Sequence, residues 1–167
     1  MADKFLYNNS GVVTEKAAIT TSAGAGDSGK IPGLDSSGRL DNSMMPVGLG
    51  ADTATITASE SLAAGDLVNV WNSTGAKVRK ADATVAGKEA HGFVLSAVSS
   101  SASATVYFEG TNTGVSGLTA GVQYLATTAG TATTTAPSGS GNVVQRVGFA
   151  TSATALNFQS LSPIVLA

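Results

Sequence analysis

Short runs of β-prone residues recur through residues 51–167, separated by turn residues at intervals of about eight to twelve positions. In two of the runs apolar and polar residues alternate, so that Val68 and Val70 share one face and Val106 and Phe108 share another. Such alternation is typical of strands with one buried face. The predicted strands cover residues 53–58, 67–72, 76–80, 91–98, 104–109, 123–127, 143–150, 155–159 and 164–166. Helical periods are nearly absent, so the sequence predicts an all-β fold, an antiparallel β-sandwich or β-barrel.

Residues 1–50 differ from the rest because they sustain neither a strand period nor a helix period. They open on an apolar run at Phe5 and continue through a stretch rich in Gly and Ser. Asp41 is expected to cap a single helical turn that runs through Met44 and Met45 and that the next residue, a proline, would end. We therefore expect an extended N-terminal arm that precedes the β-domain of residues 51–167.

Exposed Leu and Met side chains on such an arm require a partner surface. Two similar six-residue steps, 30–35 and 36–41, each combine a cation with an aliphatic residue and end on Asp. Either another protein covers these side chains, or the arm folds back over its own β-domain.

A weak internal repeat with an offset of 56 residues relates the two halves of the β-domain. The most informative match is Phe93 with Phe149, each preceded by Gly, because Ala, Gly and Ser matches arise easily by chance in this chain. Two copies of a β-meander would pack into a pseudo-symmetric sandwich or barrel. The aligned residues are Leu62, Ala64, Gly65, Gly92, Phe93, Ser96 and Ala97 with Leu118, Ala120, Gly121, Gly148, Phe149, Ser152 and Ala153.

Small residues make up about half of the 167-residue chain, with 27 Ala, 20 Ser, 20 Thr and 20 Gly. Each of these side chains buries little apolar area, at roughly 25 cal/mol per Å². The core must therefore come from scattered Val, Leu, Ile and aromatic residues, and we expect neighbouring subunits to contribute to stability.

The charge pattern argues against nucleic acid and membranes as partners. The net charge is −2, and the nine Lys and Arg residues are dispersed rather than clustered as phosphate binding requires. No stretch approaches the roughly 18 to 20 apolar residues that a membrane-spanning helix needs, and the first residues do not lead into a signal-peptide core. The chain has no Cys, so packing alone is expected to hold the fold.

No residue pattern supports catalysis, a cofactor or a metal site. Residues 24–30 have the spacing of a phosphate-binding loop, but Ile31 stands where a Ser or Thr would bind Mg²⁺. Residues 26–29 resemble the nucleophile segment of trypsin-like proteases, yet the only histidine, His91, is expected to be a strand-end residue bonded to backbone. With one His and no Cys, a metal would need an all-oxygen site, and no loop has calcium spacing. We expect a protein that is not an enzyme.

One cationic cluster and one aromatic residue leave alternatives open. Lys77, Arg79, Lys80 and Lys88 are interpreted as a solvated strand edge guarded by lysine. Trp71 is interpreted as a core or subunit-interface anchor, and the alternative is a platform on which a sugar stacks.

Several segments resemble small virion proteins of tailed bacteriophages, in particular the capsid decoration, cement or head-fibre group. They are GKIPGLDSSGRL (29–40), SMMPVG (43–48), SESLAAGDLVNV (59–70), GVQYL (121–125) and VVQRVGFA (143–150), and the likeness spans nearly the whole chain. The resemblance implies a β-rich homotrimer on the outer capsid surface of the virion, made in the host cytoplasm. It also implies an N-terminal segment that docks on the phage major capsid protein.

If the arm docks, its apolar residues would supply the contacts and two cations would lie at the rim. The expected docking residues are Phe5, Tyr7, Lys30, Ile31, Leu34, Arg39, Leu40, Met44 and Met45. The alternative function is that of a tail-fibre or spike segment that binds a host surface glycan, which would place aromatic and polar groups on exposed loops such as residues 109–116.

Overall fold

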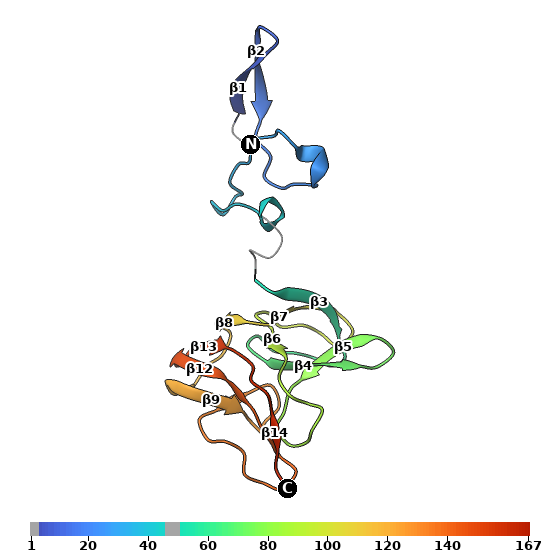
Figure 1. Ribbon diagram of the computed structural model, residues 1–167, viewed down its shortest axis with the longest axis vertical. Coiled ribbons are helices and arrows are strands. Elements are labelled where there is room, and N and C mark those ends of the chain that lie inside the picture. The colour runs from blue at the N-terminus through green and yellow to red at the C-terminus, as the bar shows by residue number, and fades with distance from the viewer. Residues whose placement is uncertain (1–3, 46–50) are drawn as a thin grey trace. The chain divides into compact units, whose positions relative to one another are not determined.

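The computed structural model describes residues 4–45 and 51–167 (Figure 1). The chain divides into two compact units, Met1–Gly50 and Ala51–Ala167. Within the described residues the only helical pieces are two 3-10 turns, η1 (Ala25–Asp27) and η2 (Asn42–Met44), and all other regular elements are strands. The prediction of an all-β fold is therefore confirmed. No helix in the described part of the chain has the length and apolar character needed to span a membrane.

The N-terminal unit begins with a β-hairpin that the sequence analysis did not predict. Strands β1 (Lys4–Asn9) and β2 (Val12–Ala17) pair antiparallel. The two-residue turn between them, Ser10 and Gly11, has positive φ at both positions (53° and 93°), which suits the right-handed twist of a hairpin. The hairpin escaped prediction because its apolar residues are consecutive rather than alternating.

The rest of the unit consists of turns held by hydrogen bonds. The Ile19 N–H donates to the Ile31 carbonyl at 3.0 Å, and the Gly33 N–H donates to the Ile19 carbonyl at 2.7 Å, which closes the loop that contains η1. Asp41 is the N-cap of η2 and accepts from the Ser43 N–H, as the sequence predicted, and Met45 ends the turn. The proline expected to stop it lies outside the described residues.

The first half of the second unit is a closed barrel with the strand order β3-β5-β4-β6-β7. All neighbouring pairs are antiparallel except β3 and β5, whose parallel pairing closes the barrel. Three predicted strands have the observed bounds. The barrel strands are β3 (Thr53–Ala58), β4 (Leu67–Asn72), β5 (Ala76–Lys80), β6 (Gly92–Phe93) and β7 (Ser103–Tyr107).

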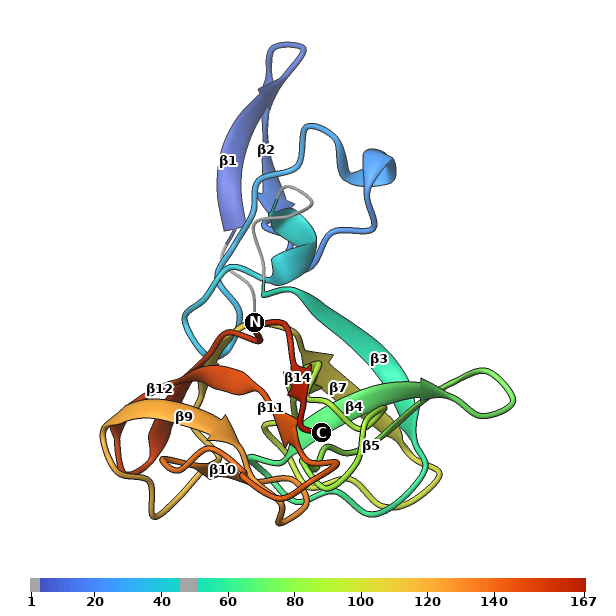
Figure 2. The same ribbon diagram turned by 60° about the horizontal axis from the view of Figure 1, so that its bottom comes forward.

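The second half is an open five-stranded sheet with the order β10-β9-β12-β13-β8. Figure 2 labels β9, β10 and β12 of this sheet, and Figure 1 labels β8 and β13. A small pair, β11 (Val143–Val144) with β14 (Ile164–Val165), accompanies it. The sheet strands are β8 (Gly110–Asn112), β9 (Gly121–Leu125), β10 (Ala132–Thr133), β12 (Arg146–Ser152) and β13 (Ala155–Phe158).

Four predicted strands, 104–109, 123–127, 155–159 and 164–166, differ from the observed bounds by one or two residues at one or both ends, two others were wrong in extent, and β8 and β10 were not predicted. The strand expected at 91–98 is only β6, because the following residues bond to a loop: the Val94 N–H donates to the Asp66 carbonyl, and Val98 bridges to Leu62. The strand expected at 143–150 is divided into β11 and β12 at Gln145, whose side chain bonds to the backbone of Ala90.

The two halves have the same strand order. When 56 is added to their residue numbers, β3, β4, β5 and β6 overlap in sequence with β8, β9, β10 and β12, respectively. The same shift places β7 directly after β13 in the sequence. The barrel order read from β5 to β3 then reproduces the sheet order read from β10 to β8, and all four equivalent pairings are antiparallel. The closing parallel pair has no counterpart in the second half.

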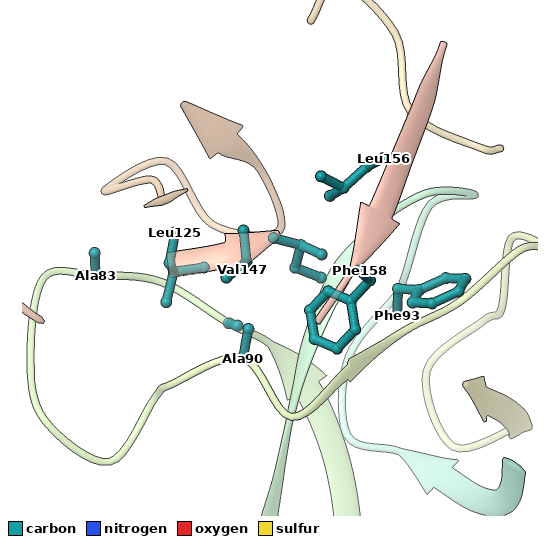
Figure 3. Packing of buried hydrophobic residues seen from close by; sticks show 9 residues of the cluster. Ala83, Ala90, Phe93, Leu125, Val147, Leu156 and Phe158 are labelled. Atoms are coloured by element: carbon teal, nitrogen blue, oxygen red, sulfur yellow. The ribbon is translucent and has the colours of Figure 1, made fainter. Parts of the chain in front are cut away.

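Two hydrophobic clusters stabilise the second unit. One fills the barrel and includes Val68, Val78 and Val106, all fully buried. The other lies between the barrel and the sheet, where Phe93 of β6 meets Phe158 of β13 edge-on at 5.6 Å between ring centroids (Figure 3). Its members are Leu67, Ala81, Ala83, Ala90, Phe93, Leu125, Val147, Leu156 and Phe158.

The repeat partners Phe93 and Phe149 lie in different environments. Phe93 is fully buried, whereas Phe149 is 40% exposed on the outer face of the sheet. Their glycine neighbours are alike: a Cβ on Gly92 would lie 2.5 Å from the Tyr107 carbonyl oxygen, and one on Gly148 would lie 1.9 Å from that of Asn157. The repeat thus preserves a close approach of strands rather than a buried aromatic ring.

Candidate functional site

The N-terminal unit carries apolar side chains that it does not bury. Every described residue from 4 to 45 is exposed or half-buried, whereas the buried apolar residues all lie in the second unit. An isolated two-stranded hairpin is marginally stable at best in water. The large apolar side chains exposed here, by 40–70%, are Leu6, Val12, Val13, Ile31, Leu34, Leu40 and Met45.

The hairpin is apolar on both faces. Its register places Phe5 and Tyr7 on one face, where their ring centroids are 6.5 Å apart and the Lys16 Nζ lies 5.2 Å from the Tyr7 ring. The opposite face carries Leu6 and Val13. Both faces therefore offer contact area to a partner.

Aspartate side chains fix the turns that follow. Asp35 Oδ1 accepts from the N–H groups of Ser37 (2.8 Å) and Arg39 (3.0 Å). Asp27 accepts from the Lys30 Nζ at 2.6 Å and from the Ala23 N–H at 2.6 Å. The bond from Lys30, together with that from Ala23, lowers the pKa of Asp27 below its ordinary value. These turns have defined shapes and are not a featureless linker.

A further contact joins two segments that are distant in the sequence. The Ser22 N–H donates to the Ser43 Oγ at 2.8 Å, and this hydroxyl donates to Asp41 Oδ1 at 2.6 Å. The hydrogen bonds from Ser43, that of its hydroxyl first, lower the pKa of Asp41. Polar bonds thus give the unit a shape without a hydrophobic core in its described part.

The structure distributes the expected docking residues over the whole unit. Four of them are exposed apolar residues on the turns: Ile31, Leu34, Leu40 and Met45. Phe5, Tyr7 and Met44 are half-buried, Arg39 is exposed, and Lys30 forms an ion pair with Asp27.

Sequence reasoning missed three residues of this surface: Leu6, Val12 and Val13. The signal that could have found them is the Ser10-Gly11 turn, because a two-residue turn would have paired the flanking apolar runs.

The residues considered for catalysis have structural partners. His91 accepts a hydrogen bond at Nδ1 from the Val70 N–H at 3.1 Å, as expected for a strand-end histidine. The 24–30 loop forms η1, with no strand and helix flanking it, and its lysine bonds to Asp27. Among residues 4–45 and 51–167, no group of three or more His, Cys, Asp or Glu side chains has the arrangement of a metal site.

No family model, curated protein or solved structure matches this chain.

Proposed function

We propose that the protein is a virion structural protein that decorates and stabilises the outer surface of a bacteriophage capsid, as a homotrimer. Its N-terminal unit binds the major capsid protein, and its β-domain supplies further contact area. The observation that carries the proposal is the contrast between the units: one holds two hydrophobic clusters, while the described part of the other exposes its apolar residues. The segments that resemble phage virion proteins support the same role.

The size of the exposed surface supports binding through several copies. Full burial of a large apolar side chain contributes about 1.5–3 kcal/mol, so covering the exposed parts of seven such residues contributes on the order of 10 kcal/mol. Association itself costs about 4–15 kcal/mol. One arm would therefore bind weakly, whereas three arms on one trimer would bind much more strongly through their high effective concentration. This role requires no reaction and no cofactor.

A second candidate is a tail-fibre or spike segment that binds a host surface glycan. The loop expected to bind the glycan is residues 109–116. Part of this loop packs against the rest of the β-domain instead, because Asn112 is fully buried and donates to the Gly65 carbonyl at 2.8 Å. The observation that favours this candidate lies elsewhere, in a hollow beside Trp71.

Deletion of residues 1–46 tests the docking role. We expect the remaining β-domain to stay folded, because both hydrophobic clusters belong to it, and to lose binding to purified expanded capsid shells. Co-sedimentation with shells measures the binding, and thermal unfolding checks the fold. Retained binding would remove the N-terminal unit from the proposal.

Copy number separates the two candidates. A decoration protein should be present in hundreds of copies per particle and a fibre in a handful, so band intensity in purified particles distinguishes them. Absence of the polypeptide from mature particles would contradict both.

A further inference from the structure

A polar hollow of ≈ 280 Å³ opens on the barrel beside the only tryptophan of the chain. Trp71 comes from β4, Arg79 and Lys80 from β5, and Ser59 and Glu60 from the residues directly after β3. These residues converge because β5 lies between β3 and β4 in the barrel. The hollow belongs entirely to the second unit and is independent of the proposed docking surface.

The aromatic ring and the guanidinium are held in fixed positions. The Trp71 Nε1–H donates to the Ser59 Oγ at 3.3 Å, and the Arg79 Cζ lies 4.5 Å from the Trp71 ring centroid. Arg79 donates from Nε to Asn69 Oδ1 at 3.0 Å and from Nη2 to the Gly87 carbonyl at 2.7 Å. Both acceptors are neutral, so Arg79 is oriented without being neutralised.

Two of the cations that line the hollow are already paired. Lys80 lies 3.3 Å from an oxygen of Asp66, and Lys88 lies 2.9 Å from one of Asp82. Two other charged side chains line the hollow, the guanidinium of Arg79 and the carboxylate of Glu60, and neither forms an ion pair with another described residue.

Arg79 and Glu60 also keep hydrogen-bonding capacity. Glu60 Oε1 accepts from the Lys80 N–H at 2.7 Å, but within residues 4–45 and 51–167 its Oε2 accepts no hydrogen bond and the Nη1 of Arg79 donates none. The hollow thus presents one free donor group and one free acceptor group of opposite charge beside an indole.

We propose that this hollow binds a neutral pyranose sugar, either a monosaccharide or the terminal residue of a glycan. Hydroxyl groups both donate and accept, so neighbouring hydroxyls can serve Glu60 and Arg79 together. The C–H groups of the sugar ring contact the part of the Trp71 indole that the Arg79 guanidinium does not cover. A charged ligand would gain no net attraction from this pair, because one group attracts it and the other repels it, and it would lose solvation on entering the hollow. The volume lies near the lower end of small-molecule sites, roughly 300 Å³, which suits a single ring.

Trp71 itself reports on binding because it is the only tryptophan. Its indole N–H signal in NMR spectra and its fluorescence are followed while the full chain is titrated with glucose, galactose and N-acetylglucosamine, and separately with glucuronate and glucosamine. We expect a saturable change with at least one neutral sugar, and at least about tenfold weaker binding of both charged sugars. No saturable response to the three neutral sugars, or tighter binding of a charged one, would overturn the proposal.

Variants locate the site. Glu60→Gln and Arg79→Gln should each weaken the affinity by at least about tenfold, since a charged hydrogen bond is lost. Arg146→Gln, which removes an exposed cation on β12, should leave it unchanged. Thermal unfolding verifies that each variant folds. Equal affinity in wild type and both hollow variants would contradict the assignment, as would a Trp71 signal that follows protein concentration alone, which would place Trp71 at a subunit interface.

Discussion

Gln145 is a single residue that connects distant parts of the β-domain. Its side chain is 2% exposed, accepts from the Ala90 N–H at 2.8 Å, and donates to the Ala90 carbonyl at 2.9 Å and to the Ser160 Oγ at 2.8 Å. Gln145→Leu would leave the Ala90 N–H buried without a partner, while the Ala90 carbonyl would keep only the hydrogen bond from the Ser160 hydroxyl at 3.0 Å. We expect the free energy of unfolding to fall by about 1–3 kcal/mol, measured in urea. The exposed Gln159→Leu should change it by less than about 0.5 kcal/mol.

Asp82 should make the stability of the domain depend on pH. Burial raises its pKa, but hydrogen bonds from Thr84 and from Lys88, 2.9 Å away, outweigh burial, so the pKa lies below the ordinary 3.8. A carboxyl with a lowered folded-state pKa stabilises the fold above its unfolded pKa, and this stabilisation is lost as the pH falls through the folded value.

Asp82→Asn should therefore be less stable than wild type at pH 7, and the difference should shrink below about pH 4. Urea unfolding across this range measures it. Thr84→Ala, which removes only one of the hydrogen bonds, should show a smaller change of the same sign. A difference that is the same at both ends of the range would refute this assignment.

Among elements, β6 and β12 depend on glycines that let a neighbouring strand come close. Gly148 has φ +135°, and a Cβ there would lie 1.9 Å from the Asn157 carbonyl oxygen, a backbone atom that cannot move aside alone. Gly148→Ala should destabilise the domain by more than about 3 kcal/mol or prevent folding. Gly117→Ala has positive φ but open space, so it should cost only about 1 kcal/mol. Similar melting temperatures for the two variants would be evidence against this explanation.

The β1–β2 hairpin allows a test of docking without deletion. The double substitution Leu6→Ser and Val13→Ser removes exposed apolar area from one face. We expect at least about tenfold weaker binding to capsid shells, since each lost side chain contributes on the order of 1 kcal/mol. The melting temperature of the β-domain should not change. Val85→Ser, at an exposed apolar position of the second unit, is the matched control and should bind like wild type.

The sequence predicted β3, β4 and β5 with their bounds because runs of β-prone residues there are delimited by turn residues. Local pattern could not predict β8 or β10, because their two or three residues are too short to show a period and they are defined by pairing with β13 and β9. The proposed docking residues on the turns were recognisable as apolar residues among Gly and Ser, whereas the hollow beside Trp71 depends on strand order that no local pattern encodes.

For the whole molecule, the two units differ in what stabilises them. The second unit has its own hydrophobic clusters and is expected to unfold cooperatively, whereas the described part of the first unit buries no apolar residue. Melting of the free full-length chain should therefore show one main transition that matches that of the 1–46 deletion variant. Addition of capsid shells should protect the hairpin amides from hydrogen exchange. Protection of these amides without shells would indicate that the first unit is stable by itself.

The missing counterpart of the β3–β5 pairing makes the two repeats unequal. The closed copy is the barrel, which encloses its own hydrophobic cluster. The open copy is the five-stranded sheet, which packs its apolar face against the outside of the barrel. A chain truncated after residue 108 would thus keep the hydrophobic cluster inside the barrel but expose Leu67 and Phe93 to solvent. Two such truncated chains would be expected to associate through these exposed apolar surfaces.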